Sequence, residues 1–145
     1  MLQDAPKGEV AVEEQVAIRD LLERYCRYID DCSSSKIADL FTEDAVLEAM
    51  GRRLVGRNEI VAFLPAEPGV VRERPVTQHL LSNVVIERSG QELRAESDWA
   101  MLRRNQEGGV DVVLAGRFRD RLSRDERGRW RIGERNVVAL TRMGR

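Results

Sequence analysis

The stretch Ile18–Asp44, IRDLLERYCRYIDDCSSSKIADLFTED, decides how the rest of this 145-residue chain has to be arranged. Its apolar residues recur at helical spacing and charged residues fill the positions between them. The pattern begins near Glu13 and predicts a long amphipathic helix that ends at Asp30. The apolar face of this helix is expected to comprise Val16, Ile18, Leu21, Leu22, Tyr25, Cys26 and Ile29.

Short elements are expected to follow this first helix. They are a second helix through Ile37, Leu40 and Phe41 that ends near Asp44, a strand pair over Ala45–Met50 and Arg53–Val55, and a third helix over Glu59–Leu64. Asn58 is the expected N-cap of the third helix, and Pro65 stops it. The segment from Pro65 to Pro75 has the composition of a loop and could form a lid or rim.

The remainder of the chain predicts a sheet. Four long segments of strand composition are separated by short glycine-containing turns: Val76–Arg88, Glu92–Arg104, Val110–Arg124 and Arg129–Thr141. Such spacing favours an antiparallel meander, and strands of this length twist and curl. We therefore expect an α+β fold with N-terminal helices packed in the concave face of a strongly curved, mainly antiparallel sheet, a cone-shaped half-barrel. A single domain over residues 12–145 would follow a flexible arm over residues 1–11.

Alternation along each strand predicts which side chains line the concave face. The expected rows are Thr77, His79, Leu81, Asn83 and Val85; Leu93, Ala95, Ser97, Trp99 and Met101; Val112, Leu114, Gly116 and Phe118; and Trp130, Ile132, Val138 and Leu140. This mixture of aromatic, aliphatic and a few polar groups suits a small-molecule pocket, and it equally suits a filled core. The candidate substrate-binding residues are Trp99, Met101, Phe118, Leu114 and Phe63.

Composition narrows the class of function. Apolar residues make up 42% and charged residues 34% of the chain, the balance of a globular domain. Lysine and arginine total 24 against 25 acids, so the charge excess of a nucleic-acid-binding protein is missing. No apolar run has the length of a membrane span or a signal peptide, and a cytoplasmic location is expected. Cys26 and Cys32 are expected to be reduced thiols.

Several motifs resemble a known family. The spacing Tyr25-x4-Asp30, followed by the run Leu40–Val46, resembles the opening of the SnoaL-like proteins, which belong to the nuclear transport factor 2-like superfamily of cone-shaped α+β barrels. The resemblance continues through Val55–Ile60, the strand start Thr77–His79 and the closing Trp130–Ile132, and so covers nearly all of the chain. It implies the fold more than a function, because this fold supports many activities.

Within that superfamily the chain is most similar to the branch of scytalone dehydratase, bile-acid dehydratase and hexachlorocyclohexane dehydrochlorinase. Those enzymes pair an aspartate at the end of the first helix with a histidine on the strand after the third, and Asp30 and His79 occupy the matching positions. Tyr25 matches a position that holds a polar catalytic side chain in that branch. The chain departs from scytalone dehydratase in having one histidine only and Ile29 in place of a tyrosine.

Arg135 falls about where the same branch can place an arginine. Strict alternation from Trp130 and Ile132 points Arg135 away from the concave face, and a bulge at Gly133 would be needed to turn it inward. The resemblance therefore implies four catalytic candidates, namely His79, Asp30, Tyr25 and Arg135.

A paired Asp30 and His79 would form a proton acceptor, because the carboxylate fixes the imidazole tautomer and stabilises the imidazolium. The implied activity is that of a cofactor-independent lyase or isomerase, dehydratase-like, which abstracts a proton from a small, largely apolar cyclic substrate. One histidine and scattered acids make a poor metal-ligand set, so neither a metal nor another cofactor is expected.

Each candidate residue also has a structural interpretation. A lone strand histidine is more often a hydrogen-bonded structural residue, Asp30 could cap the turn into the second helix, and Tyr25 could belong to the core. Two other functions stay open: a non-catalytic assembly partner resembling the β subunit of ring-hydroxylating dioxygenases, and a small-molecule binding protein. A homodimer joined through the outer faces of the sheets is the expected assembly.

Overall fold

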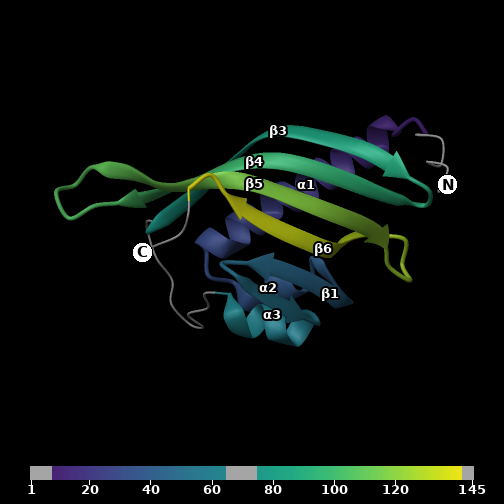
Figure 1. The fold of residues 1–145 in the computed structure, drawn as a ribbon, viewed down its shortest axis with the longest axis horizontal. Helices are drawn as coiled ribbons and strands as arrows, with labels where there is room; N and C mark the ends of the chain where they lie inside the picture. The colour runs from purple at the N-terminus through teal and green to yellow at the C-terminus, as the bar shows by residue number, and fades with distance from the viewer. Residues whose placement is uncertain (1–7, 65–74, 142–145) are drawn as a thin grey trace.

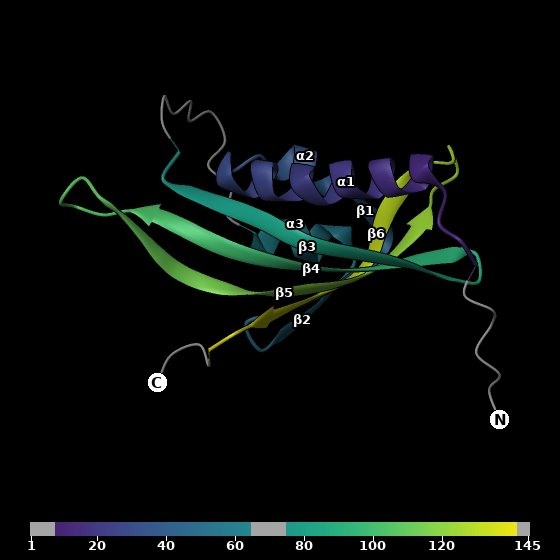
Figure 2. The ribbon, with the colours of Figure 1, turned by 90° about the horizontal axis from the view of Figure 1, so that it is seen from above.

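A computed structural model describes residues 8–64 and 75–141 and shows helices packed against one curved sheet (Figure 1). The elements in chain order are α1 (Val12–Asp30), α2 (Ser34–Ala38), β1 (Phe41–Ala49), β2 (Arg52–Val55), α3 (Arg57–Phe63), β3 (Thr77–Ser89), β4 (Glu92–Arg104), β5 (Val110–Arg124) and β6 (Trp130–Ala139). The six strands have the order β2-β1-β6-β5-β4-β3. Viewed from above, α1 runs along the concave side of the long strands (Figure 2).

The predicted fold class is confirmed. Strands β3 to β6 form the expected antiparallel meander, since each pairs antiparallel with the next along the chain. The hairpin of β1 and β2 joins the same sheet, because β1 runs parallel to β6. The sheet does not close, so β2 and β3 are its edges. The predicted lid falls, apart from Pro75, outside the described residues.

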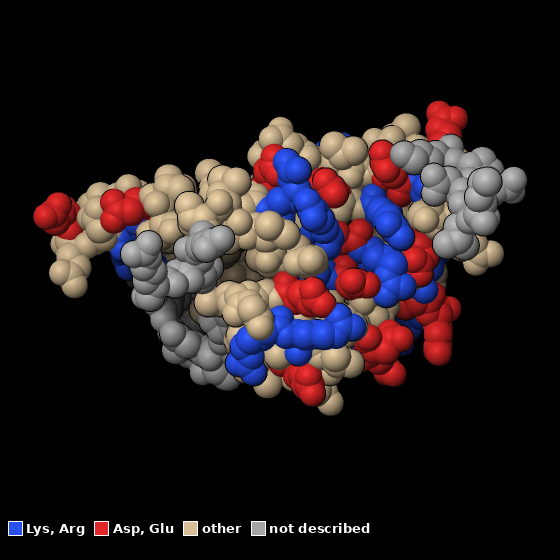
Figure 3. All heavy atoms as spheres, in the orientation of Figure 1, with Lys and Arg blue, Asp and Glu red and all other residues tan. Residues whose placement is uncertain are grey.

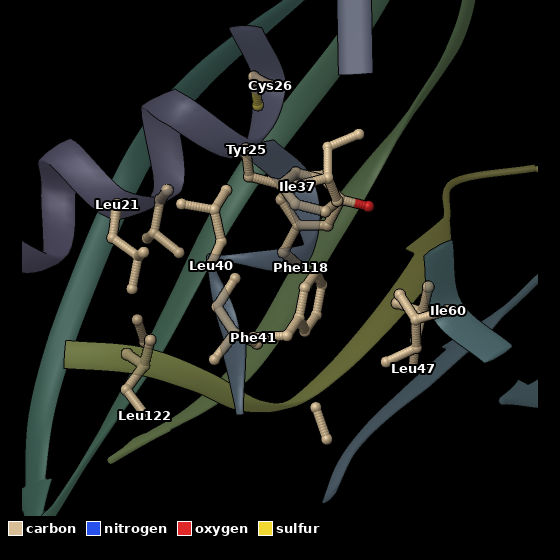
Figure 4. Close-up of a cluster of buried hydrophobic side chains, with 14 of the residues drawn as sticks. Leu21, Tyr25, Cys26, Ile37, Leu40, Phe41, Leu47, Ile60, Phe118 and Leu122 are labelled. Carbon is tan, nitrogen blue, oxygen red and sulfur yellow. The ribbon is translucent and has the colours of Figure 1, made fainter. Parts of the chain in front are cut away.

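The core lies between α1 and the sheet (Figure 4). The helix contributes Ile18, Leu21, Leu22, Tyr25 and Cys26, all buried. Facing them are further buried side chains from α2 and the strands: Ile37, Leu40, Phe41, Leu47, Leu93, Phe118, Leu122 and Ile132. Burying one large apolar side chain stabilises a fold by about 1.5–3 kcal/mol, so this layer of side chains holds α1 against the sheet.

Two predictions about the N-terminal elements were wrong. Val16 is 62% exposed, because it precedes the buried Ile18 by two positions and therefore lies on the opposite face of the helix. The second helix ends at Ala38, and Phe41 already belongs to β1. The spacing of the apolar residues fits either structure there, and pairing with β6 favours the strand, since the N–H of Ile132 donates to the carbonyl of Leu40.

The third helix also begins earlier than predicted. Gly56 stands at its N-cap with φ of 90°, a conformation that favours glycine, and Asn58 therefore lies inside the first turn. The N–H of Val55 donates to the Glu59 carboxylate across this turn. The helix thus begins at the backbone turn of Gly56 rather than at the predicted asparagine cap.

Bulges interrupt the simple alternation of β3 and β5. β3 holds one residue more than β4 between Ser82 and Val85, and Asn83 there has φ of 52°. Beyond this bulge Val84 and Ile86 become half-buried, and Val85 is 58% exposed instead of pointing inward. In β5 the extra residue is Val113, so the predicted inward residue Val112 is exposed.

A third bulge reverses the faces of β6. Arg121 and Leu122 of β5 pair with Glu134 and Ile132 of β6, so Gly133 is an extra residue in β6. Arg135 is therefore fully buried, while Val138 and Leu140, which were predicted to face inward, are exposed. The bulge that the sequence analysis required to turn Arg135 inward is present.

Gly116 is the glycine at which a side chain would conflict most directly with the sheet. A Cβ at this position would lie 1.9 Å from the Val138 carbonyl oxygen. We expect Gly116→Ala to lower the free energy of unfolding by about 1–3 kcal/mol, because the strands must separate to admit the methyl group. Urea denaturation measures the change. Gly133→Ala is the matched control, since the nearest atom to its Cβ would be 3.6 Å away; equal effects of the two substitutions would contradict the explanation.

Candidate active site

The carboxylate of Asp30 joins the end of α1 to the edge strand β3. Its Oδ1 lies 2.6 Å from His79 Nδ1 and accepts a hydrogen bond of 3.0 Å from the Thr77 hydroxyl. Its Oδ2 accepts a bond of 2.7 Å from the backbone N–H of His79. The structure therefore brings together the two residues on which the predicted dyad depends.

Local structure explains why these side chains meet. α1 ends at Asp30, since Asp31 is its C-cap and Cys32 has φ of 54°, which turns the chain away. Asp30 follows the buried residue Cys26 by four positions, so both lie on one face of the helix. Thr77 and His79 are two residues apart on β3, so their side chains lie on the same face of the strand, the face that contacts Asp30.

The imidazole of His79 is held through one nitrogen. An ionised carboxylate only accepts hydrogen bonds, so Nδ1 is the nitrogen that donates to it, and in a neutral imidazole the lone pair would then be on Nε2. No residue in the ranges 8–64 and 75–141 forms a hydrogen bond with Nε2. The His79 side chain is 12% exposed and that of Asp30 is 9% exposed, so the pair is shielded but not sealed.

A groove gives access to this pair. It has a volume of about 620 Å³ and lies between α1 and β3. Its lining residues are Glu23, Cys26, Arg27, Asp30, Asp31, Pro75, Gln78, His79, Leu80 and Leu81. The space-filling view shows a hollow in the surface toward the end of the molecule where α1 ends (Figure 3). Small molecules could reach His79 from this side.

A second polar pair lies deeper, inside the sheet. Arg135 donates two hydrogen bonds to Asp120, from Nε at 2.7 Å and from Nη2 at 2.8 Å, and both side chains are fully buried. The guanidinium lies 4.1 Å from the centre of the Tyr25 ring and 3.9 Å from that of Phe118. Burial raises the pKa of Asp120, and the charge and hydrogen bonds of Arg135 oppose that shift. The pair is bidentate and enclosed by aromatic rings, the arrangement of a structural core element.

The predicted aromatic residues gather around this ion pair rather than lining the groove. Trp99 stacks on Phe118 at 5.5 Å, and Phe118 meets the edge of Tyr25 at 5.7 Å. The ring of Trp99 also lies 6.1 Å from that of His79, so one aromatic row connects the two polar pairs. Burial raises the pKa of Tyr25, against the opposing effect of Arg135.

The other predicted binding residues are more scattered. Met101 and Leu114 are partners on β4 and β5, half-buried and beyond Trp99 along the strand. Phe63 lies on α3 with Arg52 5.2 Å above its ring, and it does not line the groove at His79. Cys26 does line that groove, and burial raises the pKa of its thiol to about 11.

Sequence reasoning overlooked two residues. Asp120 continues the inward row after Phe118 at an interval of two, so alternation alone could have identified it as a buried acid. Thr77 stands two residues before His79, and the same rule puts both on one face. Neither residue was proposed for the site.

In residues 8–64 and 75–141, no three His, Cys, Asp or Glu side chains come together in a way that could hold a metal ion. None of the helices described here is both long and apolar enough to cross a membrane.

Comparison with known proteins identifies relatives by sequence and by fold. The family model described as a SnoaL-like domain matches residues 10–136. No curated protein matches the sequence of the chain. Among solved structures, a variant of the Mycobacterium tuberculosis protein Rv3472, of unknown function, is 27% identical with a TM-score of 0.76, over 89% of this chain and 77% of that chain.

Two structures from Novosphingobium aromaticivorans are similar in fold. One is provisionally described as a scytalone dehydratase and is 21% identical, with a TM-score of 0.73 over 92% of this chain and 90% of its own. The other is the β subunit of a protein provisionally described as an aromatic-ring-hydroxylating dioxygenase. It is also 21% identical, with a TM-score of 0.74 over 92% and 93% of the two chains. Both comparisons show a shared fold.

The buried ion pair predicts an asymmetric response to mutation. Asp120→Asn leaves the Arg135 charge buried without a counter-charge, and we expect a loss of about 3–5 kcal/mol in the free energy of unfolding. The double substitution Asp120→Leu with Arg135→Met replaces the pair by apolar groups and should recover most of that loss. Thermal and urea denaturation of both variants provide the measurement. A double variant no more stable than Asp120→Asn would show that the charges themselves are required.

Proposed function

Because the chain belongs to the SnoaL-like family, we propose that it is a cofactor-independent lyase or isomerase whose base is His79, oriented by Asp30. The observation that carries the proposal is the 2.6 Å contact between His79 Nδ1 and Asp30 Oδ1, which leaves Nε2 unpartnered among the described residues and beside a groove. A base held in one tautomer at the wall of a groove is the arrangement that proton abstraction requires.

The proposed reaction begins at a carbon next to an electron-withdrawing group. Nε2 of His79 takes the proton, and the electron pair of the broken C–H bond moves toward the electron-withdrawing group, whose oxygen takes the negative charge of an enolate. In a lyase this electron pair then forms the C=C bond of the product as the neighbouring C–O bond breaks, and the imidazolium returns its proton to the departing oxygen to form water. In an isomerase the imidazolium returns the proton to another carbon. Asp30 stabilises the imidazolium in either case.

The proposed substrate stays a small, largely apolar ring, although most of the side chains that line the groove are polar or charged. Leu80 and Leu81 offer an apolar surface in the groove, while Gln78, Glu23 and Arg27 offer polar groups around it. A ring compound with a carbonyl or hydroxyl substituent fits this mixture. The catalytic roles of Tyr25 and Arg135 stay predictions, and the bonds of Arg135 to Asp120 favour a supporting role for both.

The same geometry bears on the other candidate functions. A subunit that only supports assembly, as the β-subunit neighbour suggests, would use the contact of Asp30 with His79 to hold α1 on β3, but it would have no need of an unpartnered Nε2 beside a groove. A binding protein without chemistry would use the same groove. The dyad is the feature that favours catalysis over both.

Substitution of the dyad tests the proposal. Small cyclic ketones and hydroxylated ring ketones are incubated with the protein in D2O, and NMR detects deuterium at the carbon next to the carbonyl. We expect His79→Ala and Asp30→Asn to slow exchange about 10²–10⁴-fold, as loss of a general base or of its tautomer does. Asp20→Asn, at an exposed acid of α1 that does not line the groove, is the matched control and should behave as the wild type. Full activity of both dyad variants on a turned-over compound would refute the proposal.

The proposal includes a homodimer. Exposed apolar side chains mark the outer face of the sheet, among them Leu80, Val112, Val138 and Leu140. Strand pairing aligns Leu80 and Leu140 in one row across the sheet with two alanines between them, since Leu80 pairs with Ala100, Ala100 pairs with Ala115, and the N–H of Leu140 donates to Ala115. A band of this kind on a sheet face suits association with a second copy.

A charge in that band tests the assembly. We expect Leu140→Asp to shift the mass measured by light scattering from dimer to monomer, because an aspartate would be desolvated in the interface. Val16→Asp, which adds the same charge at an exposed position of α1, should leave the dimer intact. A wild-type protein that is monomeric at high concentration would exclude the homodimer.

A further inference from the structure

Among the residues that the structure describes, Thr77 is the one residue other than His79 that donates a hydrogen bond to the Asp30 carboxylate. The hydroxyl donates to Oδ1 at 3.0 Å, and the same oxygen lies 2.6 Å from His79 Nδ1. Oδ2 accepts the backbone N–H of His79. Both oxygens are therefore engaged by β3, and Oδ1 is engaged twice.

This double engagement restricts how the carboxylate can turn. The terminal torsion of an aspartate is broad, and without Thr77 the carboxylate would be held by His79 alone, through Nδ1 at Oδ1 and the backbone N–H at Oδ2. The hydroxyl of Thr77 fills the second acceptor position of Oδ1 and further restricts rotation about the Cβ–Cγ bond. Since Oδ1 is also the atom that binds the imidazole, the orientation of the imidazole depends on Thr77 indirectly, through the Asp30 carboxylate.

We propose that Thr77 is a positioning residue, which holds the Asp30 carboxylate so that the His79 imidazole keeps its proton on Nδ1 and presents Nε2 to the groove. The proposal rests on the proposed function for its catalytic meaning, but the tautomer of the imidazole is a property of the folded protein alone. Thr77 does not itself line the groove, so it acts through Asp30, which does.

The single histidine of the chain makes the test direct. In untagged, 15N-labelled protein every imidazole signal belongs to His79, and long-range 1H–15N spectra show which nitrogen is protonated. Thr77→Val removes the hydroxyl and keeps the β-branched shape that suits a strand. Thr77→Ser restores a hydroxyl in a smaller side chain.

Thr42→Val is the matched control. Its hydroxyl also donates to a carboxylate at 3.0 Å, that of Asp44, but the bond is exposed and distant from the dyad in sequence and contacts. This variant reports the general effect of losing a threonine hydroxyl from a strand.

We expect the wild type to show the Nδ1–H tautomer. Thr77→Val should show a mixture with the Nε2–H tautomer and a roughly tenfold faster exchange of the Nδ1 proton, the effect of losing one hydrogen bond to a charged group. Thr77→Ser and Thr42→Val should resemble the wild type. On any compound that the wild type turns over, Thr77→Val should lower kcat by a similar factor with KM little changed.

Each outcome decides a separate question. Imidazole signals of folded Thr77→Val identical to those of the wild type would overturn the positioning role, whatever the dyad does in catalysis. A change that Thr77→Ser fails to reverse, or that Thr42→Val reproduces, would overturn it as well. The proposed function fails on its own evidence, namely unchanged turnover in His79→Ala and Asp30→Asn, and that result would leave the effect of Thr77 on the imidazole standing.

Discussion

The structure depends on how α1 is fastened to the free edge of the sheet. β3 has no strand beyond it, so its outward backbone groups need partners or become a site for aggregation. Two side chains of the helix bind such backbone groups, since Asp30 accepts the N–H of His79 and Arg19 donates to the carbonyl of Val84. Glu14 adds an ion pair with the Arg88 side chain of the same strand. The helix thereby covers the edge as well as the core. The candidate site is one of these fastenings, and its chemistry follows from the same contact that protects the strand.

The interior behind this edge is occupied. The Arg135–Asp120 pair lies between Tyr25 and Phe118, and Trp99 stacks on Phe118. Taking two charges out of water costs several kcal/mol per ion, and the bidentate geometry offsets that cost. His79 lies at the rim of this core, where it adjoins a groove of about 620 Å³. The protein thus separates a fully buried polar pair from a polar pair that lines a groove.

The two pairs differ in the exposure of their unused atoms, since Nη1 of Arg135, which is unpartnered among the described residues, is itself buried. Asp120 and Arg135 are both fully buried, so neither can meet a substrate without rearrangement of the core. The His79 side chain keeps 12% of its surface exposed and presents one nitrogen without a protein partner in the described ranges. An imidazole with one nitrogen committed and one free is the more useful base.

Much of the fold followed from local patterns in the sequence. Helical spacing located α1, and glycine turns located the four long strands within one or two residues, because a period of 3.6 or 2.0 is a property of neighbouring residues. The matching positions of Asp30 and His79 followed from resemblance, and Asp120 was within reach of alternation. Register was not: the bulges at Asn83, Val113 and Gly133 changed which residues face the core.

The sequence by itself therefore determined the class of fold, the order of the elements and the residues that could form a dyad. Only the tertiary structure decided that Phe41 begins a strand, that Arg135 is buried against Asp120, and that the Asp30 carboxylate is held by Thr77 as well as His79. The physical reason is the range of the forces involved. Turns and amphipathic faces depend on residues close together in the chain, whereas a bulge or a buried ion pair is stable only once strands distant in sequence have paired.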